Sequence, residues 1–205
     1  MKIILLVEGE TEKKALPDFF RRWLKGRIDP LPGILPINTK GCDNHIKECA
    51  LKASLYLKNP DVIAVFGLLD LYGPKTIPDH CKTPQEKCDY LRQRLENEIA
   101  SPKFKQHFAI HELEAWLLSD PDIFPADVKR ALPGKVVKPE AVNSTEPPAK
   151  LLTRLYRERT KRDYKKVAHG VELFARLDPE KAKSKCPALA ALLDDMLALA
   201  QASRG

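Results

Sequence analysis

Two glutamates, Glu8 and Glu12, stand just after a run of five apolar residues, Ile3 to Val7, near the start of the chain. An apolar run followed by acidic residues and Gly9 predicts a buried strand that carries carboxylates at its C-terminal end. Thr11 can cap a helix with Glu12 in its first turn, so the two carboxylates can face each other across a strand-to-helix turn. Two clustered carboxylates indicate a hard divalent cation.

A structural explanation also exists for part of this pattern. Acidic residues are common in the first turn of a helix because they complement the helix dipole, which accounts for Glu10 and Glu12 equally well. That explanation does not cover Glu8, which stands at the strand end itself. Loops at strand ends are rich in functional residues but not reserved for them, so local features leave both interpretations open.

Two further acidic groups follow apolar runs in the same way. One is Asp70, the last residue of a second run, and the other comprises His111, Glu112 and Glu114 after a third. Parallel strands direct their C-terminal ends to one edge of a sheet, so these groups are expected to converge with Glu8. Crowded carboxylates repel each other unless a cation or a proton neutralises them. The pattern therefore predicts a metal site at that edge.

The elements that position these groups alternate between strands and helices. Hydrophobic periodicity predicts strands at residues 3–7, 34–38, 61–70 and 104–110, with helices at about 11–25, 43–58 and 84–99 between them and a short helix over 111–120. Such alternation is typical of an α/β fold with a mainly parallel sheet and helices on both faces.

The amino-acid composition of the sequence changes after residue 120. Residues 121–149 contain six prolines and predict a loop-rich excursion with one short helix near 127–132; helices are then predicted at 150–164, 171–177 and 187–202. We predict an α/β core over residues 1–120. Residues 121–205 are expected to form a proline-rich loop and a basic C-terminal helical extension packed on the core.

The net charge of +7 is unevenly distributed. Residues 129–166 hold twelve Lys or Arg against four acids, a surplus of eight, so the rest of the chain has a net charge of −1. One basic segment on a near-neutral body favours a polyanionic partner such as nucleic acid. A solvated helix face is the commoner explanation for charge runs in general.

Composition narrows the class of protein further. No apolar run approaches the ~20 residues of a membrane span, and the first run stops at Glu8, which predicts a cytoplasmic protein without a membrane partner. The five cysteines are an odd number without an export signal, so reduced thiols are expected. Their spacings lack the paired CxxC of a structural zinc site.

Three motifs, taken in order, resemble those of a prokaryotic family of uncharacterised proteins with a Toprim-like domain, often encoded beside ATPases in phage-defence loci. They are V-E-G-E-T-E at residues 7–12, F-G-L-L-D-L-Y-G at 66–73 and I-H-E-L-E-A-W-L-L-S-D-P at 110–121. The resemblance continues through residues 147–150 and 164–170 to Cys186 and Pro187, so it covers nearly the whole chain. The ordered set is fairly specific, whereas each motif alone is weak.

The resemblance implies a set of site residues. Toprim domains of topoisomerases, primases and overcoming-lysogenization-defect nucleases hold magnesium with a glutamate after the first strand and an Asp-x-Asp after a later one. The glutamate corresponds to Glu8, the helix-side acid of the nuclease-type variant to Glu12, and the first aspartate to Asp70. The second aspartate is replaced by Tyr72, which is not a comparable ligand for a hard metal ion.

The ligand lost at Tyr72 has to come from elsewhere, and Glu112 and Glu114 are the best candidates, ahead of Asp79. Residues two apart on a helix lie about 200° apart around its axis, so both glutamates should not face one ion. We expect Glu114 to point inward and Glu112 to cap the short helix, although both are kept as metal candidates.

The expected activity is a divalent-metal-dependent nuclease that uses Mg²⁺ or Mn²⁺ and acts on DNA or RNA, in phage defence with a partner ATPase. The expected catalytic residues are Glu8, Glu12, Asp70, Glu114 and Lys166, with His111, Lys150 and His169 in contact with substrate phosphate. Solvated lysines and a packed core histidine are the structural alternatives for the basic residues.

Two other functions stay open at this point. One is a non-catalytic Toprim-like module that binds nucleic acid or regulates a partner, and the other is a phosphoryl-transfer enzyme acting on nucleotides. The apolar last helix and Trp23 also leave room for a homodimer.

Overall fold

Four parallel strands form the central sheet in a computed structural model that describes residues 1–74, 76–141 and 146–204. The strand order is β2-β1-β3-β4, with bounds β1 (Lys2–Val7), β2 (Gly33–Asn38), β3 (Val62–Asp70) and β4 (Phe104–Ala109). Part of the predicted proline-rich loop, residues 142–145, lies outside the described residues.

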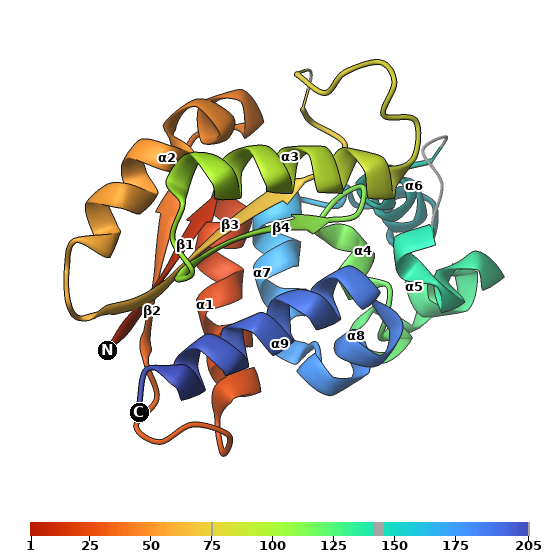
Figure 1. Ribbon diagram of the computed structural model, residues 1–205. Coiled ribbons are helices and arrows are strands. Elements are labelled where there is room, and N and C mark those ends of the chain that lie inside the picture. Colours follow the sequence, from red (N-terminus) through yellow and green to blue (C-terminus); the bar gives the residue numbers. More distant parts are fainter. Residues whose placement is uncertain (75, 142–145, 205) are drawn as a thin grey trace.

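Three helices make the crossovers between consecutive strands: α1 (Glu10–Leu24), α2 (Cys42–Leu57) and α3 (Pro84–Ile99). Crossovers between parallel strands are right-handed, and β2 and β3 lie on opposite sides of β1, so α1 and α2 must cover opposite faces. Figure 1 shows α2 and α3 on one face of the sheet and α1 on the other. The predicted α/β class, with a parallel sheet and helices on both faces, is confirmed.

Burial on both faces explains why the strands are almost wholly apolar. In β1, Ile3 and Leu5 belong to the hydrophobic cluster on the α1 side, whereas Ile4 and Leu6 belong to a second cluster with residues of α2 and α3. All five apolar residues that predicted this strand, Ile3 to Val7, are therefore buried, because both faces of β1 are covered.

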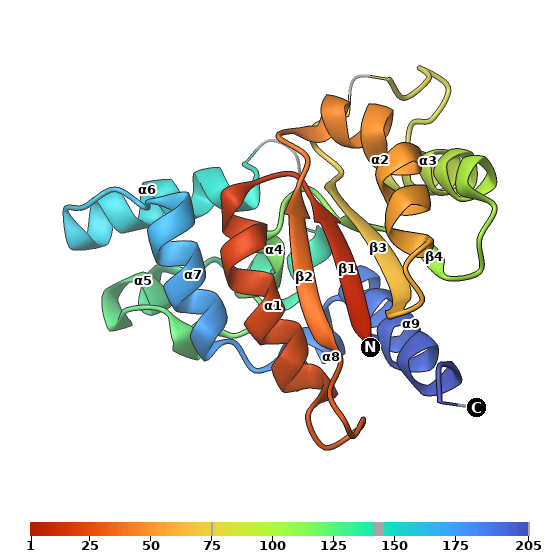
Figure 2. The same ribbon diagram turned by 90° about the vertical axis from the view of Figure 1, so that its left-hand side faces the viewer.

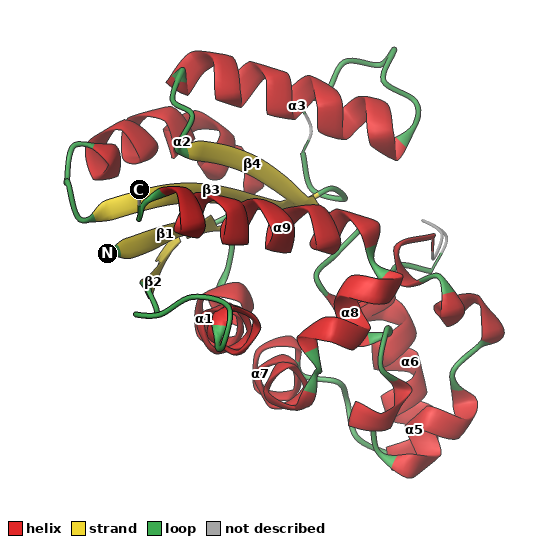
Figure 3. Ribbon diagram, turned by 60° about the horizontal axis from the view of Figure 1, so that its bottom comes forward, coloured by secondary structure: helices red, strands yellow, loops and turns green. Residues whose placement is uncertain are grey.

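The chain after β4 is largely helical. It forms α4 (Glu114–Leu117), α5 (Ala126–Ala131), α6 (Pro148–Thr160), α7 (Lys166–Arg176), α8 (Pro179–Lys185) and α9 (Pro187–Ala202), with 3₁₀ turns at Pro121–Ile123, Gly134–Val137 and Pro139–Ala141. Figure 2 shows α7 beside α1, and Figure 3 shows α9 across the same face of the sheet.

Residues on both sides of position 120 share one hydrophobic cluster. It joins Ile3 and Leu5 of the sheet to Leu189, Leu193 and Met196 of α9. The predicted boundary between core and extension stays a prediction, but the last helix does serve as core packing. In the described ranges, no helix combines the length and the apolar character that crossing a bilayer requires.

Two predicted helices differ from the structure. The helix predicted over 111–120 shrinks to the four residues of α4, and Asp120 instead accepts a hydrogen bond from Asp122 N at the following 3₁₀ turn. The helix predicted to begin at residue 171 begins at Lys166, because its exposed first turn lacks the apolar spacing that periodicity detects. Lys166 therefore opens a helix that packs on α1.

Gly67 of β3 faces a buried polar group on the α2 side of the sheet. A Cβ at this position would overlap the amide oxygen of Gln106 and lie 3.2 Å from His45 Nε2, and both side chains are fully buried. We expect Gly67→Ala to lower the free energy of unfolding by about 3 kcal/mol, the upper end for overpacking. Urea denaturation measures this, with Gly134→Ala as the control, where a Cβ meets no atom within 4 Å. Equal stabilities of the two variants would contradict the prediction.

Candidate acidic site

The carboxyl ends of β1 and β3 mark the point where the chain departs in opposite directions across the sheet. β2 lies on the outer side of β1, and β4 lies on the outer side of β3. Open α/β sheets bind ligands in the crevice at such a switch point. Glu8 follows β1 directly and Asp70 is the last residue of β3, so both are positioned at this crevice.

Hydrogen bonds connect the three acidic strand ends. Glu8 Oε1 accepts a hydrogen bond of 2.6 Å from the backbone N–H of Asp70. Asp70 Oδ1 accepts one of 3.0 Å from the backbone N–H of Leu113, just before α4. The end of β1 is therefore tied to β3, and β3 to the segment that carries Glu114, so the predicted convergence of these groups is present.

Lys166 completes this arrangement from the first residue of α7. Its Nζ lies 3.2 Å from Glu114 Oε2 and 3.7 Å from Asp70 Oδ2. One ammonium contacts both carboxylates, so the two oxygens cannot be further apart than these distances combined. The Glu114 side chain is 1 % exposed, and neither of its oxygens has a hydrogen bond of good geometry within the described chain.

Glu12 folds back over the turn between β1 and α1. Its side chain is buried, and a Cβ on Gly9 would lie 2.9 Å from Glu12 Oε2, so glycine at this position leaves room for the carboxylate. The charge of Glu12 acts on both Glu8 and Asp70. We call Glu8, Glu12, Asp70 and Glu114 the acidic cluster.

Burial dominates the electrostatics of the acidic cluster. Desolvation raises the pKa of Glu8 to about 7, reinforced by the nearby charge of Glu12. Desolvation likewise raises the pKa of Asp70 and of Glu114, while Lys166 opposes both shifts. Burial by itself would lower the pKa of Lys166, but Glu114 and Asp70 outweigh it and raise that pKa. Burial therefore favours the protonated forms of Glu8, Asp70 and Glu114, whereas Lys166 favours their charged forms.

Glu112 has a different partner from the one that we predicted. Its Oε2 accepts a hydrogen bond of 2.9 Å from the backbone N–H of Ala149, in the first turn of α6. It thus caps α6, far along the chain, instead of the short helix that follows it, and one of its oxygens is already engaged. Sequence spacing does not reveal this bond because α6 begins 36 residues later.

The predicted phosphate-binding residues come from three different segments of the chain. His111 is half-buried with a φ of 65°, and burial lowers its pKa. Lys150 is exposed on α6. His169 stacks on Tyr164 with ring centroids 5.6 Å apart, on α7 one turn after Lys166.

Two tyrosines behave differently at this end of the sheet. Tyr72, at the position of the second aspartate, is 56 % exposed, and its side chain has no carboxylate that could bind a metal ion. Tyr164 is buried, and burial followed by the charge of Glu114 raises its pKa. No spacing or composition signal indicates Tyr164, which stands two residues before α7 and comes under the influence of the Glu114 charge as α7 packs beside α4.

The side-chain geometry bears directly on metal binding. Among the described residues, no three His, Cys, Asp or Glu side chains are arranged to bind one ion together. Lys166 lies between Asp70 and Glu114, and Glu8 is turned to a backbone N–H. All five cysteines are free thiols, as predicted.

The raised pKa of Glu8 has a consequence for stability. The folded-state pKa of about 7 exceeds the ordinary 4.5, so the folded protein binds more protons between these values. The free energy of unfolding contributed by Glu8 therefore falls as pH rises from about 4.5 to 7. We compare the free energy of unfolding of Glu8→Gln with that of the wild type at each pH. The difference in favour of Glu8→Gln should be larger at pH 8 than at pH 4 by roughly 2 kcal/mol.

Urea denaturation at the two pH values tests this expectation. Glu10→Gln is the matched control, because it removes a carboxylate from the same turn at an exposed position. A gain in stability that is the same at both pH values, or equal in the control, would refute the assignment to Glu8.

Residues 7–197 match the model of a protein family described as "Domain of unknown function (DUF4276)". Neither a curated protein nor a solved structure matches the chain. The matched range begins at the end of β1 and extends into α9, so it contains the whole acidic cluster together with Lys166.

Proposed function

The chain belongs to the DUF4276 family, and from the chemistry of its acidic cluster we propose that it is a Toprim-like, divalent-metal-dependent nuclease that hydrolyses phosphodiesters of DNA or RNA. The observation that carries this proposal is the meeting of Glu8, Asp70, Glu114 and Lys166 at the switch point of a parallel sheet. Clustered titratable groups with shifted pKa values at such a crevice are typical of catalytic sites.

The donor set suits a hard cation. Both oxygens of Glu114 lack a hydrogen bond of good geometry in the described chain, although Lys166 Nζ lies 3.2 Å from Oε2. Oxygen-only ligands favour Mg²⁺ or Mn²⁺. Binding by Glu8, Asp70 and Glu114 requires the Lys166 ammonium to leave its position between the last two. A bound divalent ion supplies an activated water and stabilises charge on the phosphate.

The residues of the chain have separate tasks in this proposal. The bonds from Asp70 N to Glu8 and from Leu113 N to Asp70 hold the carboxylates at the crevice. Lys166, once displaced from between Asp70 and Glu114, is the cation that contacts the substrate phosphate. The basic segment at residues 129–166 attracts the polyanionic substrate.

The decisive experiment combines calorimetry with a cleavage assay. Wild-type protein is titrated with Mn²⁺ and then incubated with labelled single-stranded and duplex DNA and RNA, with Mg²⁺, Mn²⁺ or EDTA. We expect binding heat and EDTA-sensitive cleavage in the wild type. Asp70→Asn, which removes charge but keeps the shape of the side chain, should lose both. No binding heat and no cleavage in the wild type would refute the nuclease.

A non-catalytic nucleic-acid-binding or regulatory module is the second candidate. The lack of a three-ligand group in the described residues, and the ammonium already seated between two carboxylates, favour it. In that case Lys166 serves as a permanent counter-ion. Nucleic-acid binding without metal binding or cleavage would select this function. The partner ATPase and the role in phage defence stay predictions.

A further inference from the structure

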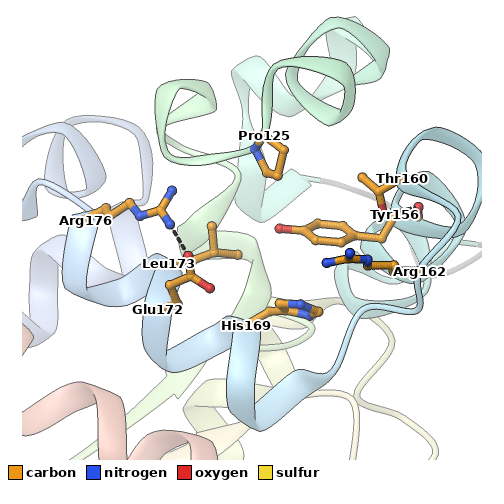
Figure 4. A pocket seen from close by; sticks show the side chains of 8 residues that line it. All are labelled: Pro125, Tyr156, Thr160, Arg162, His169, Glu172, Leu173 and Arg176. Carbon is orange, nitrogen blue, oxygen red and sulfur yellow. Dashed lines mark hydrogen bonds and ion pairs between the residues drawn. The ribbon is translucent and has the colours of Figure 1, made fainter.

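A pocket of about 170 Å³ lies where α6 and α7 meet the start of α5. Tyr156 of α6 extends into it opposite Pro125, and Leu173 of α7 lines its wall, as Figure 4 shows. His169 of α7 and Arg162, from the turn between α6 and α7, lie below the tyrosine ring. The pocket thus combines apolar and aromatic walls with a guanidinium group.

The size of the pocket limits what enters it. A cavity of about 150 Å³ holds one benzene ring, whereas sites for larger organic ligands begin at about 300 Å³. The ring of Tyr156 is held in place by His169 and Tyr164, at centroid distances of 5.0 and 5.4 Å. Tyr156 is 5 % exposed, so only the part of its ring that faces the pocket is open to a flat ring that enters there.

The charges around the pocket favour an anion near that ring. Arg176 is paired with Glu172 and also donates to the carbonyl of Ile123 at 3.2 Å. Arg162 is exposed, and no acidic side chain in the described chain pairs with it. It is therefore the cation at this pocket that is available to a ligand.

The pocket is close to the acidic cluster along α7. His169 follows Lys166 by three residues, which places it on the same side of the helix with a rise of about 4.5 Å. Tyr164 links the two places, since its ring stacks on His169 and its hydroxyl is influenced by the charge of Glu114. A flexible chain bound at the acidic cluster can therefore reach the pocket.

We propose that this pocket holds one base of a single-stranded nucleic acid, with the base against Tyr156 and a phosphate on Arg162. The proposal rests on the proposed function, because it names the substrate class as single-stranded. A base inside a duplex is stacked on both faces and has to leave the helix before it enters a pocket. Stacking on an aromatic side chain and a nearby cation are the two contacts by which single strands are bound without sequence preference.

Fluorescence anisotropy with a labelled 12-nucleotide single strand, and with the duplex of the same sequence, tests the proposal in EDTA. We expect Tyr156→Leu and Arg162→Ala each to weaken single-strand binding about 10-fold. Duplex binding should be unchanged in Tyr156→Leu and should fall in Arg162→Ala no more than in Arg159→Ala, the charge control. Arg159→Ala removes the same charge from the exposed end of α6 outside this pocket and should weaken both probes alike. Tyr156→Phe keeps the ring and should bind like the wild type.

Single-strand binding that is unchanged in both pocket variants, equal losses for the two probes, or no binding by the wild type would overturn the proposal. Arg162 is exposed, so Arg162→Ala decides the matter if Tyr156→Leu does not fold. EDTA separates this test from the nuclease test, since binding without metal does not depend on catalysis. Cleavage with intact binding in the pocket variants would refute the pocket alone, and pocket-dependent binding without cleavage would refute the nuclease alone.

Discussion

Lys166→Met is expected to raise the affinity for Mn²⁺ about 10-fold while it lowers the rate of metal-dependent cleavage by about 10²- to 10³-fold. The ammonium lies 3.2 Å from Glu114 and 3.7 Å from Asp70, so it competes with a divalent ion for the same carboxylates. Its removal also takes away the cation proposed to contact the phosphate. Calorimetry and single-turnover cleavage measure the two effects separately.

Lys165→Met is the matched control for this variant. Lys165 carries the same charge one position earlier, is exposed, and forms no ion pair with the described part of the chain. It should bind metal like the wild type and lose only the modest, salt-dependent share of substrate affinity that one phosphate contact provides. Cleavage by Lys166→Met at the wild-type rate would show that Lys166 is only a counter-ion.

Phe174→Ala is expected to lower the free energy of unfolding by about 3–5 kcal/mol, the cost of truncating a fully buried phenylalanine. The ring is 1 % exposed and packs edge-on against Phe19 of α1 and Trp116 of α4, at centroid distances of 5.7 and 6.4 Å. It therefore anchors α7 to α1 and α4, the helices that carry Glu12 and Glu114 of the acidic cluster. Urea denaturation gives the stability, and cleavage well below the midpoint should fall as well, because Lys166 is held less firmly.

Val167→Ala gives the comparison on the same helix. Val167 is 38 % exposed, so its truncation should change stability by no more than about 0.5 kcal/mol. A loss of stability in Phe174→Ala as small as in Val167→Ala would mean that α7 is not anchored through this ring.

Much of the fold can be predicted from the residue pattern, because the interactions that determine it join residues close together in the sequence. The apolar runs ending at Val7 and Asp70 indicate strands buried on both faces, and the Pro84 to Ile99 helix is bounded as predicted, with Thr83 and Glu86 forming a capping box. The start of α7 at Lys166 and the whole of α8 escape periodicity because their exposed turns carry few apolar residues. Their helical state comes from packing against α1 and α9.

The candidate site is likewise predictable from the sequence only in part. That Glu8, Asp70 and Glu114 would gather at one edge follows from the parallel order of the strands, since Glu8 and Asp70 stand at strand ends and Glu114 follows the end of β4 by five residues. The partners of these groups do not follow from it. The bond of Glu112 to Ala149 and the ion pairs of Lys166 join residues dozens of positions apart.

The sequence by itself determined the α/β architecture and the acids that gather at the carboxyl edge, because strand burial and helix capping depend on residues within a few positions of each other. Only the tertiary structure decided how those acids are balanced. The packing of α7 on α1 brings Lys166 between Asp70 and Glu114, buries Tyr164 beside Glu114 and opens the pocket at Tyr156. These contacts depend on how the chain closes in space, which no local pattern of residues records.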